Sequence, residues 1–250
     1  MTHLADAHTA QPSLKGRKAI ITGGTTGIGR AIAVLLAAEG AKVFICGRDG
    51  DFLTDALSRI REVGEGDGIR ADVTDRDDLR RVFDAGERYL DGLDIAVINA
   101  AVPVEGAAET GEDELRYALE ADFTAYVVSA HIAAEKMQAG SDIVLIGSMS
   151  AVSRKGASAY TAAKGGVQAF APALRKELAE KDIKVGLIEP GFTGADFQYP
   201  EFPPDKQVEL INAAKMLRAE DIAVATHFML RQPRRTAVSL MRVETRLEHP

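Results

Sequence analysis

Two side chains spaced for proton transfer lie in the second half of the chain. Tyr160 and Lys164 are four residues apart in the run Y-T-A-A-K, within an Ala- and Gly-rich stretch with helical character. Four residues make about one helical turn, so both side chains share a helix face. A phenol has a reference pKa of about 10, and a nearby ammonium favours its ionised form. The pair is a candidate acid–base device, although the same spacing also occurs on ordinary surface helices.

Strand-like and helix-like segments alternate around this pair. The Tyr160 helix is expected over about residues 158–181, and one long helix over 112–139. The β-prone runs are residues 18–22, 41–46, 68–73, 93–100, 141–148, 183–189 and 237–244. This alternation predicts an α/β fold of the doubly wound Rossmann type, a seven-stranded parallel sheet with helices on both faces. We expect residues 1–15 to be a disordered lead-in and residues 16–250 to form a single domain.

A glycine-rich turn, G-G-T-T-G-I-G, follows the first expected strand. Its glycines let the backbone approach a phosphate at the N-terminus of the next helix, although their spacing differs from G-x-G-x-x-G. The turn alone is weak evidence, but its place in a strand–turn–helix–strand unit predicts a dinucleotide site. The candidate binding residues are Gly23, Thr25, Thr26, Gly27, Ile28 and Gly29.

Further candidate residues fall just past the carboxyl ends of the expected strands. They are Asp72, Asn99, Ser148 and the Pro190-Gly191 pair. In open α/β sheets, ligands bind in the crevice at those ends. We therefore expect these residues to share one site with the glycine turn.

Composition and charge disfavour several classes of partner. The 250-residue chain is 46% hydrophobic and has a net charge of −7. An acidic chain argues against nucleic acid or an anionic membrane as a main partner, and no apolar run approaches the ~20 residues of a membrane span. The single cysteine, Cys46, excludes an internal disulfide and fits a reducing cytoplasm. No His, Cys and carboxylate spacing indicates a metal site.

Together, these motifs resemble the short-chain dehydrogenase/reductase family, in its compact single-domain branch. They occur in the family's order from about residue 14 to residue 245. The matches are T-G-G-T-T-G-I-G at 22–29, D-V at 72–73, N-A-A at 99–101, Ser148, Y-T-A-A-K at 160–164 and P-G at 190–191. The resemblance implies an enzyme that moves hydride between a nicotinamide cofactor and a small-molecule alcohol or carbonyl substrate.

The resemblance also implies roles for the matching residues. Tyr160 would exchange a proton with the substrate oxygen, Lys164 would lower the tyrosine pKa and bind the nicotinamide ribose, and Ser148 would hold the substrate oxygen. The remaining expected cofactor contacts are Asp72 and Val73 at the adenine, Asn99 and Ala100 beside the adenosine, and Pro190, Gly191, Phe192 and Thr193 at the nicotinamide end.

Asp122 departs from the family pattern. The family usually has Asn there, in the helix before the fifth strand, where it steadies a water in the proton relay. A carboxylate can still accept hydrogen bonds from that water and from Lys164, but it cannot donate when ionised. We expect Asp122 to belong to the catalytic set, with an altered relay.

The end of the second expected strand bears on the choice of cofactor. An acidic residue there would bind the ribose hydroxyls of NAD(H) and repel a 2′-phosphate. Gly47 takes that place and Arg48 follows it, and a guanidinium favours a phosphate. We therefore expect NADP(H), with NAD(H) as the alternative. Against this, Asp49 could neutralise Arg48, and the glycine turn lacks the Lys or Arg of many NADP-preferring relatives.

The substrate and the assembly are less constrained by the sequence. Residues 193–216 correspond to the family's substrate lid, where aromatics and prolines indicate either a partly apolar pocket or a loop packed on the core. Arg154 and Lys155 either favour an anionic or polar substrate or belong to a solvated loop. Apolar residues on several faces of the Tyr160 helix and of the long helix before the fifth strand predict a homotetramer, with a homodimer as the second choice.

Two other functions stay open. The first is a non-catalytic NADP(H)-binding sensor or regulatory module; the intact Ser148, Tyr160 and Lys164 argue against it, while Asp122 keeps it open. The second is an isomerase or epimerase that uses bound nicotinamide transiently. That branch usually has a longer chain with a separate substrate domain.

Overall fold

The main sheet contains seven strands, all parallel, in the order β3-β2-β1-β4-β5-β6-β9. The computed structural model describes residues 11–194 and 202–247. The strands are β1 (Lys18–Thr22), β2 (Lys42–Gly47), β3 (Glu65–Arg70), β4 (Ile95–Ile98), β5 (Asp142–Ile146), β6 (Lys184–Pro190) and β9 (Leu240–Val243). Sequential strands diverge from β1 in both directions, which is the predicted doubly wound topology.

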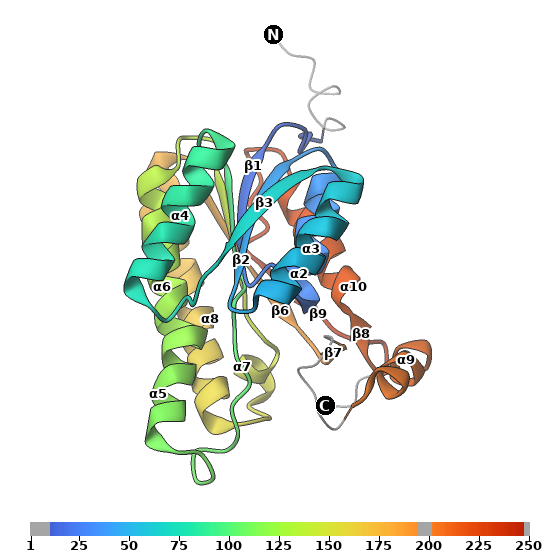
Figure 1. Ribbon diagram of the computed structural model, residues 1–250. Helices are drawn as coiled ribbons and strands as arrows, with labels where there is room; N and C mark the ends of the chain where they lie inside the picture. Colours follow the sequence, from blue (N-terminus) through green and yellow to red (C-terminus); the bar gives the residue numbers. More distant parts are fainter. Residues whose placement is uncertain (1–10, 195–201, 248–250) are drawn as a thin grey trace.

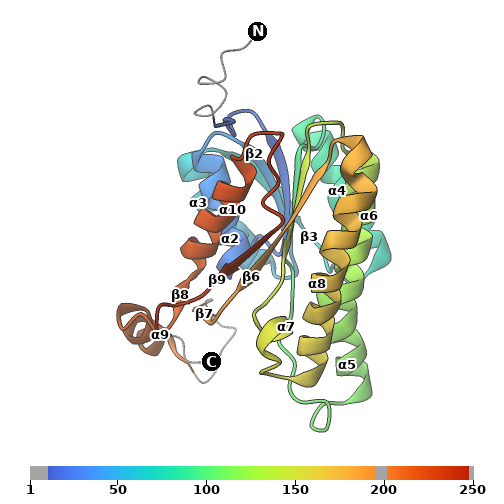
Figure 2. The same cartoon turned by 180° about the vertical axis from the view of Figure 1, so that it is seen from behind.

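Helices cover both faces of the sheet, as Figures 1 and 2 show. One layer consists of α2 (Gly27–Ala38), α3 (Gly50–Val63) and α10 (Ala219–Leu230). The other consists of α4 (Arg76–Leu90), α6 (Ala125–Lys136) and α8 (Ser158–Leu178), with α5 (Glu112–Leu119) continuing α6 beyond the carboxyl ends of the strands. The predicted fold is therefore confirmed.

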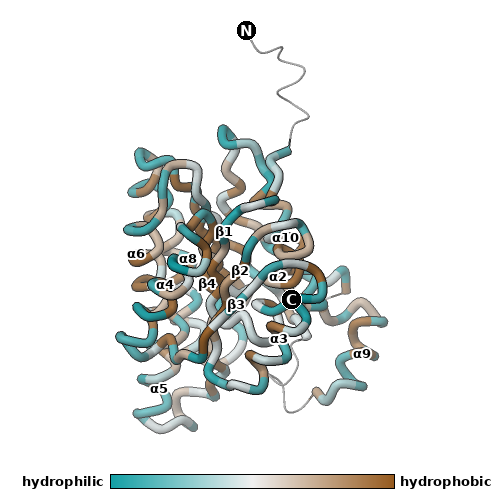
Figure 3. The backbone as a smooth tube through the Cα atoms, turned by 45° about the horizontal axis from the view of Figure 1, so that its top comes forward, coloured by the Kyte–Doolittle hydropathy of each residue, from teal (hydrophilic) through white to brown (hydrophobic). Residues whose placement is uncertain are grey.

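The central strands are buried on both faces, and their apolar residues alternate between two clusters. Ile20 points into the cluster under α4, α6 and α8, whereas its neighbour Ile21 points into the cluster under α2, α3 and α10. The hydrophobic colouring of the central strands in Figure 3 follows this burial. Each fully buried side chain of this size stabilises the fold by roughly 1.5–3 kcal/mol.

Two expected elements have different limits in the structure. The third strand begins at Glu65 rather than at Gly68, because its glycines belong to the strand: a Cβ on Gly66 would lie 2.7 Å from Val43 Cγ2. The long helix expected over 112–139 is α5, a π-helical segment η1 (Glu120–Thr124) and α6, which ends at Lys136.

The folded part of the chain begins earlier than expected, and the structure describes part of the expected lid. The lead-in expected through residue 15 is too long, because Leu14 is 1% exposed and packs in the α2 cluster. At the start of the expected lid, β7 (Thr193–Gly194) pairs with β8 (Leu217–Arg218), which directly follows the lid, and α9 (Pro204–Asn212) lies between them in sequence. Residues 195–201 of that lid lie outside the described residues.

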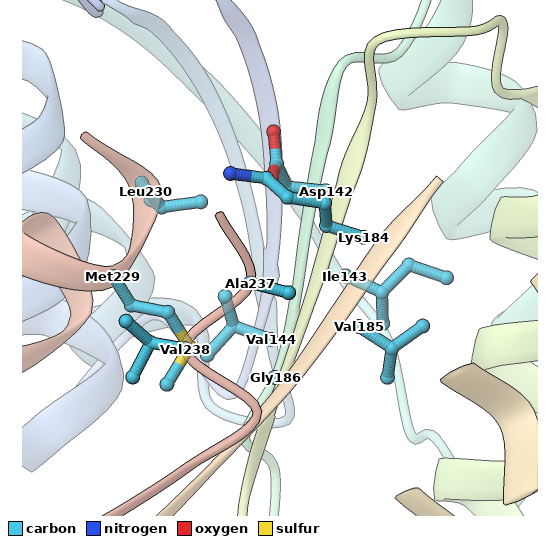
Figure 4. A pocket seen from close by; sticks show the side chains of 10 residues that line it. All are labelled: Asp142, Ile143, Val144, Lys184, Val185, Gly186, Met229, Leu230, Ala237 and Val238. Carbon is cyan, nitrogen blue, oxygen red and sulfur yellow. The ribbon is translucent and has the colours of Figure 1, made fainter. Parts of the chain in front are cut away.

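A cluster of charges lies at the amino ends of the strands. Asp142, whose side chain is 5% exposed, lies 2.9 Å from Arg17, 3.3 Å from Arg234 and 3.4 Å from Lys184. Figure 4 shows Asp142 and Lys184 at one end of a small hollow of about 10 Å³, lined mainly by apolar side chains such as Met229. That volume is about one water molecule, so the hollow is a packing gap rather than a ligand site.

Candidate active site

Tyr160 and Lys164 lie on α8, as predicted, and Lys164 points into the protein. The ammonium of Lys164 lies 5.7 Å from the centroid of the Tyr160 ring, and this lysine is 1% exposed. Gly166 lets α8 approach the π segment η1, because a Cβ there would lie 2.7 Å from Phe123 Cε2. The close approach of these two helices brings Lys164 within range of the charge of Asp122.

Lys164 has two hydrogen-bond acceptors among the described residues. Its ammonium donates to the hydroxyl of Tyr126 at 2.8 Å and to the carbonyl of Ile146 at 3.3 Å. Burial lowers the pKa of Lys164 to about 8, and the negative charge of Asp122 opposes that shift. The ammonium is therefore charged at neutral pH but holds its proton less tightly than an exposed lysine.

Asp122 lies in the middle of the π segment and is fully buried. Its Oδ1 accepts a hydrogen bond from the amide of Val102 at 2.8 Å, while its Oδ2 is buried without a hydrogen-bond partner in the described structure. Burial raises the pKa of Asp122 to about 6, and the attraction of Lys164 only partly offsets this effect. Local π-helical turns are often found at functional sites.

Ser148 follows β5 and is held beside β6. The amides of its neighbours Gly147 and Met149 donate to the carbonyls of Ile188 and Pro190, at 2.7 and 2.9 Å. The Ser148 hydroxyl accepts from the amide of Ser150, at the start of α7 (Ser150–Ser153). Ser148 is two residues from the carbonyl of Ile146 that Lys164 contacts, so both lie at the carboxyl end of β5.

The glycine turn lies between β1 and α2. Gly23 and Gly27 have φ values of +65° and +48°, in the region that favours glycine. A Cβ on Gly23 would lie 2.8 Å from the Cα of Ala100, and one on Gly29 would lie 2.5 Å from the Asn99 amide nitrogen. Side chains at these positions would push the turn away from β4.

Asn99 and Ala100, which directly follow β4, hold the start of the glycine turn in place. The Asn99 side-chain amide donates to the carbonyls of Thr22 and Gly23, at 3.1 and 3.2 Å. The backbone amides of Asn99 and Ala100 donate to the Thr22 hydroxyl, at 3.0 and 3.2 Å. The structure therefore gives Asn99 a supporting contact with the glycine turn, in addition to the adenosine contact that the resemblance implies.

The remaining residues of the turn begin α2. Thr26 precedes the helix in an extended conformation without a side-chain cap, and the first turn of α2 carries no acidic residue. By contrast, carboxylates of Asp49 and Asp75 cap α3 and α4. Thr25 is 6% exposed and packs under Gly47, and Ile28 packs against the α2 cluster. The positive end of the α2 dipole is therefore not neutralised by its own first turn.

A tyrosine links two candidate residues at the expected adenosine end. The Tyr117 hydroxyl donates to Asp72 Oδ2 at 2.9 Å and accepts from the Arg48 guanidinium at 2.6 Å. The Asp72 carboxylate also accepts two hydrogen bonds from Thr74. Although burial opposes it, these hydrogen bonds and the charge of Arg48 lower the pKa of Asp72. Asp49, which follows Arg48, accepts hydrogen bonds from the amides of Asp51 and Phe52 at the start of α3.

Residues 190–193 are held between β9 and the short β7–β8 pair. The Gly191 amide donates to the carbonyl of Val243 at 2.7 Å, and the carbonyl of Phe192 accepts from the Leu217 amide at 2.8 Å. The Thr193 side chain is 4% exposed and donates to the Gly191 carbonyl. Val73, which follows Asp72, packs against the cluster under α4, α6 and α8.

Sequence reasoning missed two tyrosines of this site. Tyr126 contacts Lys164, and Tyr117 contacts Arg48 and Asp72. Tyr126 lies four residues after Asp122, so the spacing that identified the acid–base pair would also have placed Tyr126 near it. Tyr117 had no comparable signal, because its helix is amphipathic and a tyrosine there fits a half-buried face.

Among residues 11–194 and 202–247, no group of three or more His, Cys, Asp or Glu residues is arranged to hold a metal ion. None of the helices in these ranges combines the length and apolar character of a membrane span.

The doubly wound sheet defines a Rossmann-type α/β protein, and comparisons with known proteins identify its family. The family model for short chain dehydrogenases matches residues 17–205. An uncharacterised oxidoreductase of Staphylococcus aureus (strain MRSA252) is 30% identical over 234 residues, which cover 90% of this chain and 96% of the relative. The chain therefore belongs to the short-chain dehydrogenase/reductase family of oxidoreductases.

Two further relatives carry a cofactor in their names. The chloroplastic NADPH-dependent aldehyde reductase 1 of Arabidopsis thaliana is 33% identical over 196 residues, which cover 72% of this chain and 67% of that protein. The structure of a short chain dehydrogenase from Burkholderia cenocepacia J2315 in complex with NADP has 26% identity and a TM-score of 0.84. The match covers 93% of this chain and 98% of that one.

Proposed function

We propose that this protein transfers hydride between NADP(H) and the CH–OH or C=O group of a small alcohol, aldehyde or ketone. The observation that carries the proposal is the buried Lys164 ammonium, 5.7 Å from the ring centroid of Tyr160 on the same helix. A charge in this position favours the tyrosinate and so lets Tyr160 give and take a proton near neutral pH.

The residues present fit a nicotinamide dinucleotide. The glycine turn has no room for side chains at Gly23 and Gly29, so its backbone can approach a pyrophosphate closely. The uncapped N-terminus of α2 offers a favourable end of a helix dipole to the phosphates. We propose that Asp72 and Val73 lie at the adenine and residues 190–193 at the nicotinamide.

The bound nicotinamide would supply the hydride chemistry, and the protein would supply position and a proton. Ser148 holds the substrate oxygen in place with its hydroxyl. Tyr160 donates its phenolic proton to that oxygen during reduction and removes it during oxidation. Lys164 stabilises the resulting tyrosinate, and Asp122 keeps Lys164 charged. Proton transfer of this kind contributes typically ~10²–10⁴-fold to the rate.

The adenosine end supports a preference for NADP(H) over NAD(H). Thr25 fills the space that a side chain at Gly47 would need, so the acidic residue typical of NAD(H) sites does not fit there. The carbonyl of Arg48 accepts from the Arg70 guanidinium at 2.7 Å, which adds a second cation beside Arg48. Two guanidiniums favour a 2′-phosphate. The Arabidopsis reductase, named as NADPH-dependent, and the Burkholderia dehydrogenase, solved with NADP, agree with this proposal.

The activity is tested by incubating the purified protein with NADPH or NADH and a panel of aldehydes and ketones. We expect oxidation of NADPH with at least one carbonyl, and a loss of at least ~10²-fold in kcat for Tyr160→Phe. Tyr89→Phe is the matched control, because Tyr89 lies near the end of α4 and packs against Phe44 of β2, away from the site. NADPH binding with no turnover on any substrate would instead favour the sensor.

The cofactor preference is tested separately with Arg48→Ala. We expect the KM for NADPH to rise about tenfold or more, since a charge-assisted hydrogen bond contributes about 1.5–3 kcal/mol. The KM for NADH should change little. A wild-type preference for NADH that Arg48→Ala leaves untouched would contradict the assignment.

We propose a homotetramer, or else a homodimer, built partly on α6 and α8. An open hollow of about 670 Å³ lies on their outer side and is lined by apolar residues, including Val127, Phe170 and Leu174, together with charged residues at its rim. Light scattering coupled to size-exclusion chromatography measures the assembly. A monomer at micromolar concentration would contradict it.

A further inference from the structure

Tyr126 connects the active-site lysine to two strands of the sheet. It is 1% exposed, and its hydroxyl lies 2.8 Å from the Lys164 ammonium. The same hydroxyl lies 3.0 Å from the carbonyl of Asn99, after β4, and 3.0 Å from the carbonyl of Ile146, at the end of β5. Because a carbonyl can only accept, the hydroxyl proton points to one of these carbonyls, and a lone pair of the hydroxyl faces Lys164.

We propose that Tyr126 is a positioning residue, whose hydroxyl anchors the Lys164 ammonium to the ends of β4 and β5 beside Tyr160. This inference rests on the proposed function, because it concerns the same acid–base pair. Lysine has a long flexible side chain, and its second acceptor, the Ile146 carbonyl, is distant at 3.3 Å. The Tyr126 hydroxyl is therefore the closer of two contacts that fix the ammonium among the described residues, and one of its three N–H donors is left for other groups.

The anchoring contact also bears on whether Lys164 stays charged. The titratable groups around the pair are Asp122 from η1, Tyr126 from α6, and Tyr160 and Lys164 from α8. Burial raises the pKa of Tyr126 well above its ordinary value, so this phenol stays neutral and accepts a hydrogen bond without competing for the proton. An acceptor of this kind favours the charged form of Lys164.

Removing the Tyr126 oxygen should therefore change Tyr160 through Lys164. Without that acceptor, the Lys164 ammonium loses its proton at a lower pH. Since burial already lowers the pKa of Lys164 to about 8, a further decrease would discharge it near neutral pH. Tyr160 would then lose the cation that favours its ionised form, and its own pKa would rise.

Tyr126→Phe removes the oxygen and keeps the ring, which lies 4.3 Å from the ammonium. The first measurement needs neither substrate nor cofactor: tyrosinate formation is followed by near-ultraviolet absorbance as the pH is raised. The titration of Tyr160 is the difference between each protein and the same protein carrying Tyr160→Phe. We expect the pKa of Tyr160 to be about one unit higher in the Tyr126→Phe background. Equal values in the two backgrounds overturn the inference, and Tyr89→Phe should leave the value unchanged.

Catalysis gives the second measurement. For Tyr126→Phe we expect kcat for oxidation to fall about tenfold at neutral pH and to recover at high pH, since a shift of one pKa unit changes the tyrosinate fraction tenfold. A loss of kcat that is the same at every pH would indicate a purely structural role and overturn the inference.

The outcomes separate this inference from the proposed function. If the wild-type protein oxidises or reduces no substrate, the proposed function fails, but the absorbance titration still reports whether Tyr126 controls Tyr160. If the wild-type protein is active and the pKa of Tyr160 is the same in both backgrounds, only the inference fails. Should Tyr126→Phe not fold, 3-fluorotyrosine at position 126 weakens the oxygen as an acceptor while preserving its contacts. The same upward direction is then expected, and no change overturns the inference.

Discussion

The pH dependence of stability tests whether burial or the ion pair with Lys164 determines the pKa of Asp122. Burial raises its pKa to about 6, from an ordinary value of 3.8, despite the Lys164 ammonium. A difference of this size corresponds to about 3 kcal/mol, since a tenfold change in proton affinity is worth about 1.4 kcal/mol. The substitution Asp122→Asn removes this titration and keeps an oxygen for the Val102 amide.

The sign follows from which state holds the proton. Between about pH 4 and pH 6 the unfolded chain has released the Asp122 proton, whereas the folded chain still holds it. The free energy of unfolding of the wild type therefore falls as the pH rises through this window. Lys164 stays protonated below about pH 8 and adds nothing there. We expect Asp122→Asn to gain about 3 kcal/mol relative to the wild type between pH 4 and pH 6.5.

Urea denaturation of the cofactor-free protein, followed by circular dichroism at several pH values, measures this difference. A constant offset from the new amide cancels, because only the slope with pH is compared. Asp84→Asn is the opposite control: a hydrogen bond from Lys136 lowers the pKa of Asp84, so its stabilising effect is lost as the pH falls. A flat difference for Asp122→Asn, or one that favours the wild type as the pH rises, would refute the reasoning.

Three further substitutions test other contacts. Gly166→Ala should lower the free energy of unfolding by about 1–3 kcal/mol, because the added methyl group overpacks against the π segment, and it should also lower kcat. Gly165→Ala, whose methyl group meets open space, should change neither quantity. Thermal unfolding and turnover measure both effects. Asp142→Asn should lower the free energy of unfolding in denaturant titrations by about 2–3 kcal/mol, a moderate value because the three cations around Asp142 are partly exposed. It should leave kcat unchanged, because Asp142 lies at the amino ends of the strands, away from the candidate site. Gly47→Asp should not produce NADH preference unless Thr25 is also reduced to a smaller residue, which KM values for both cofactors would show.

The sequence predicted the layers of the fold better than the limits of its elements. Alternating apolar strands and amphipathic helices leave few arrangements other than a parallel sheet covered on both faces. The start of β3 was wrong, because Glu65–Arg70 carries glycines that normally indicate a loop. Here those glycines make room for Val43 and Ile45 of the neighbouring strand. That reason exists only in the packed sheet and cannot be found in the local sequence.

The candidate site shows the same division. The elements that carry Tyr160 and the glycine turn could be predicted, because both lie in recognisable strand and helix patterns. Tyr117 could not be assigned, because its partners Arg48 and Asp72 come from distant parts of the chain. The spacing from Asp122 could have placed Tyr126 near that residue, but its contact with the distant Lys164 appears only in the folded chain. The π turn around Asp122 was missed as well, since one extra residue in a helical turn leaves little trace in an apolar pattern.

The π turn joins α5 and α6 without a break, since the flanking residues Leu119 and Ala125 keep helical backbone angles. Tyr117, which contacts Arg48 and Asp72, and Tyr126, which contacts Lys164, therefore lie on one uninterrupted helical segment. If a bound nucleotide displaced Tyr117 from Arg48, a shift of this helical segment would also move Tyr126, which supports Lys164. Nucleotide binding and proton binding at Lys164 should then be thermodynamically linked, so that the nucleotide changes the proton affinity of Lys164 by the same factor as the proton changes the nucleotide affinity.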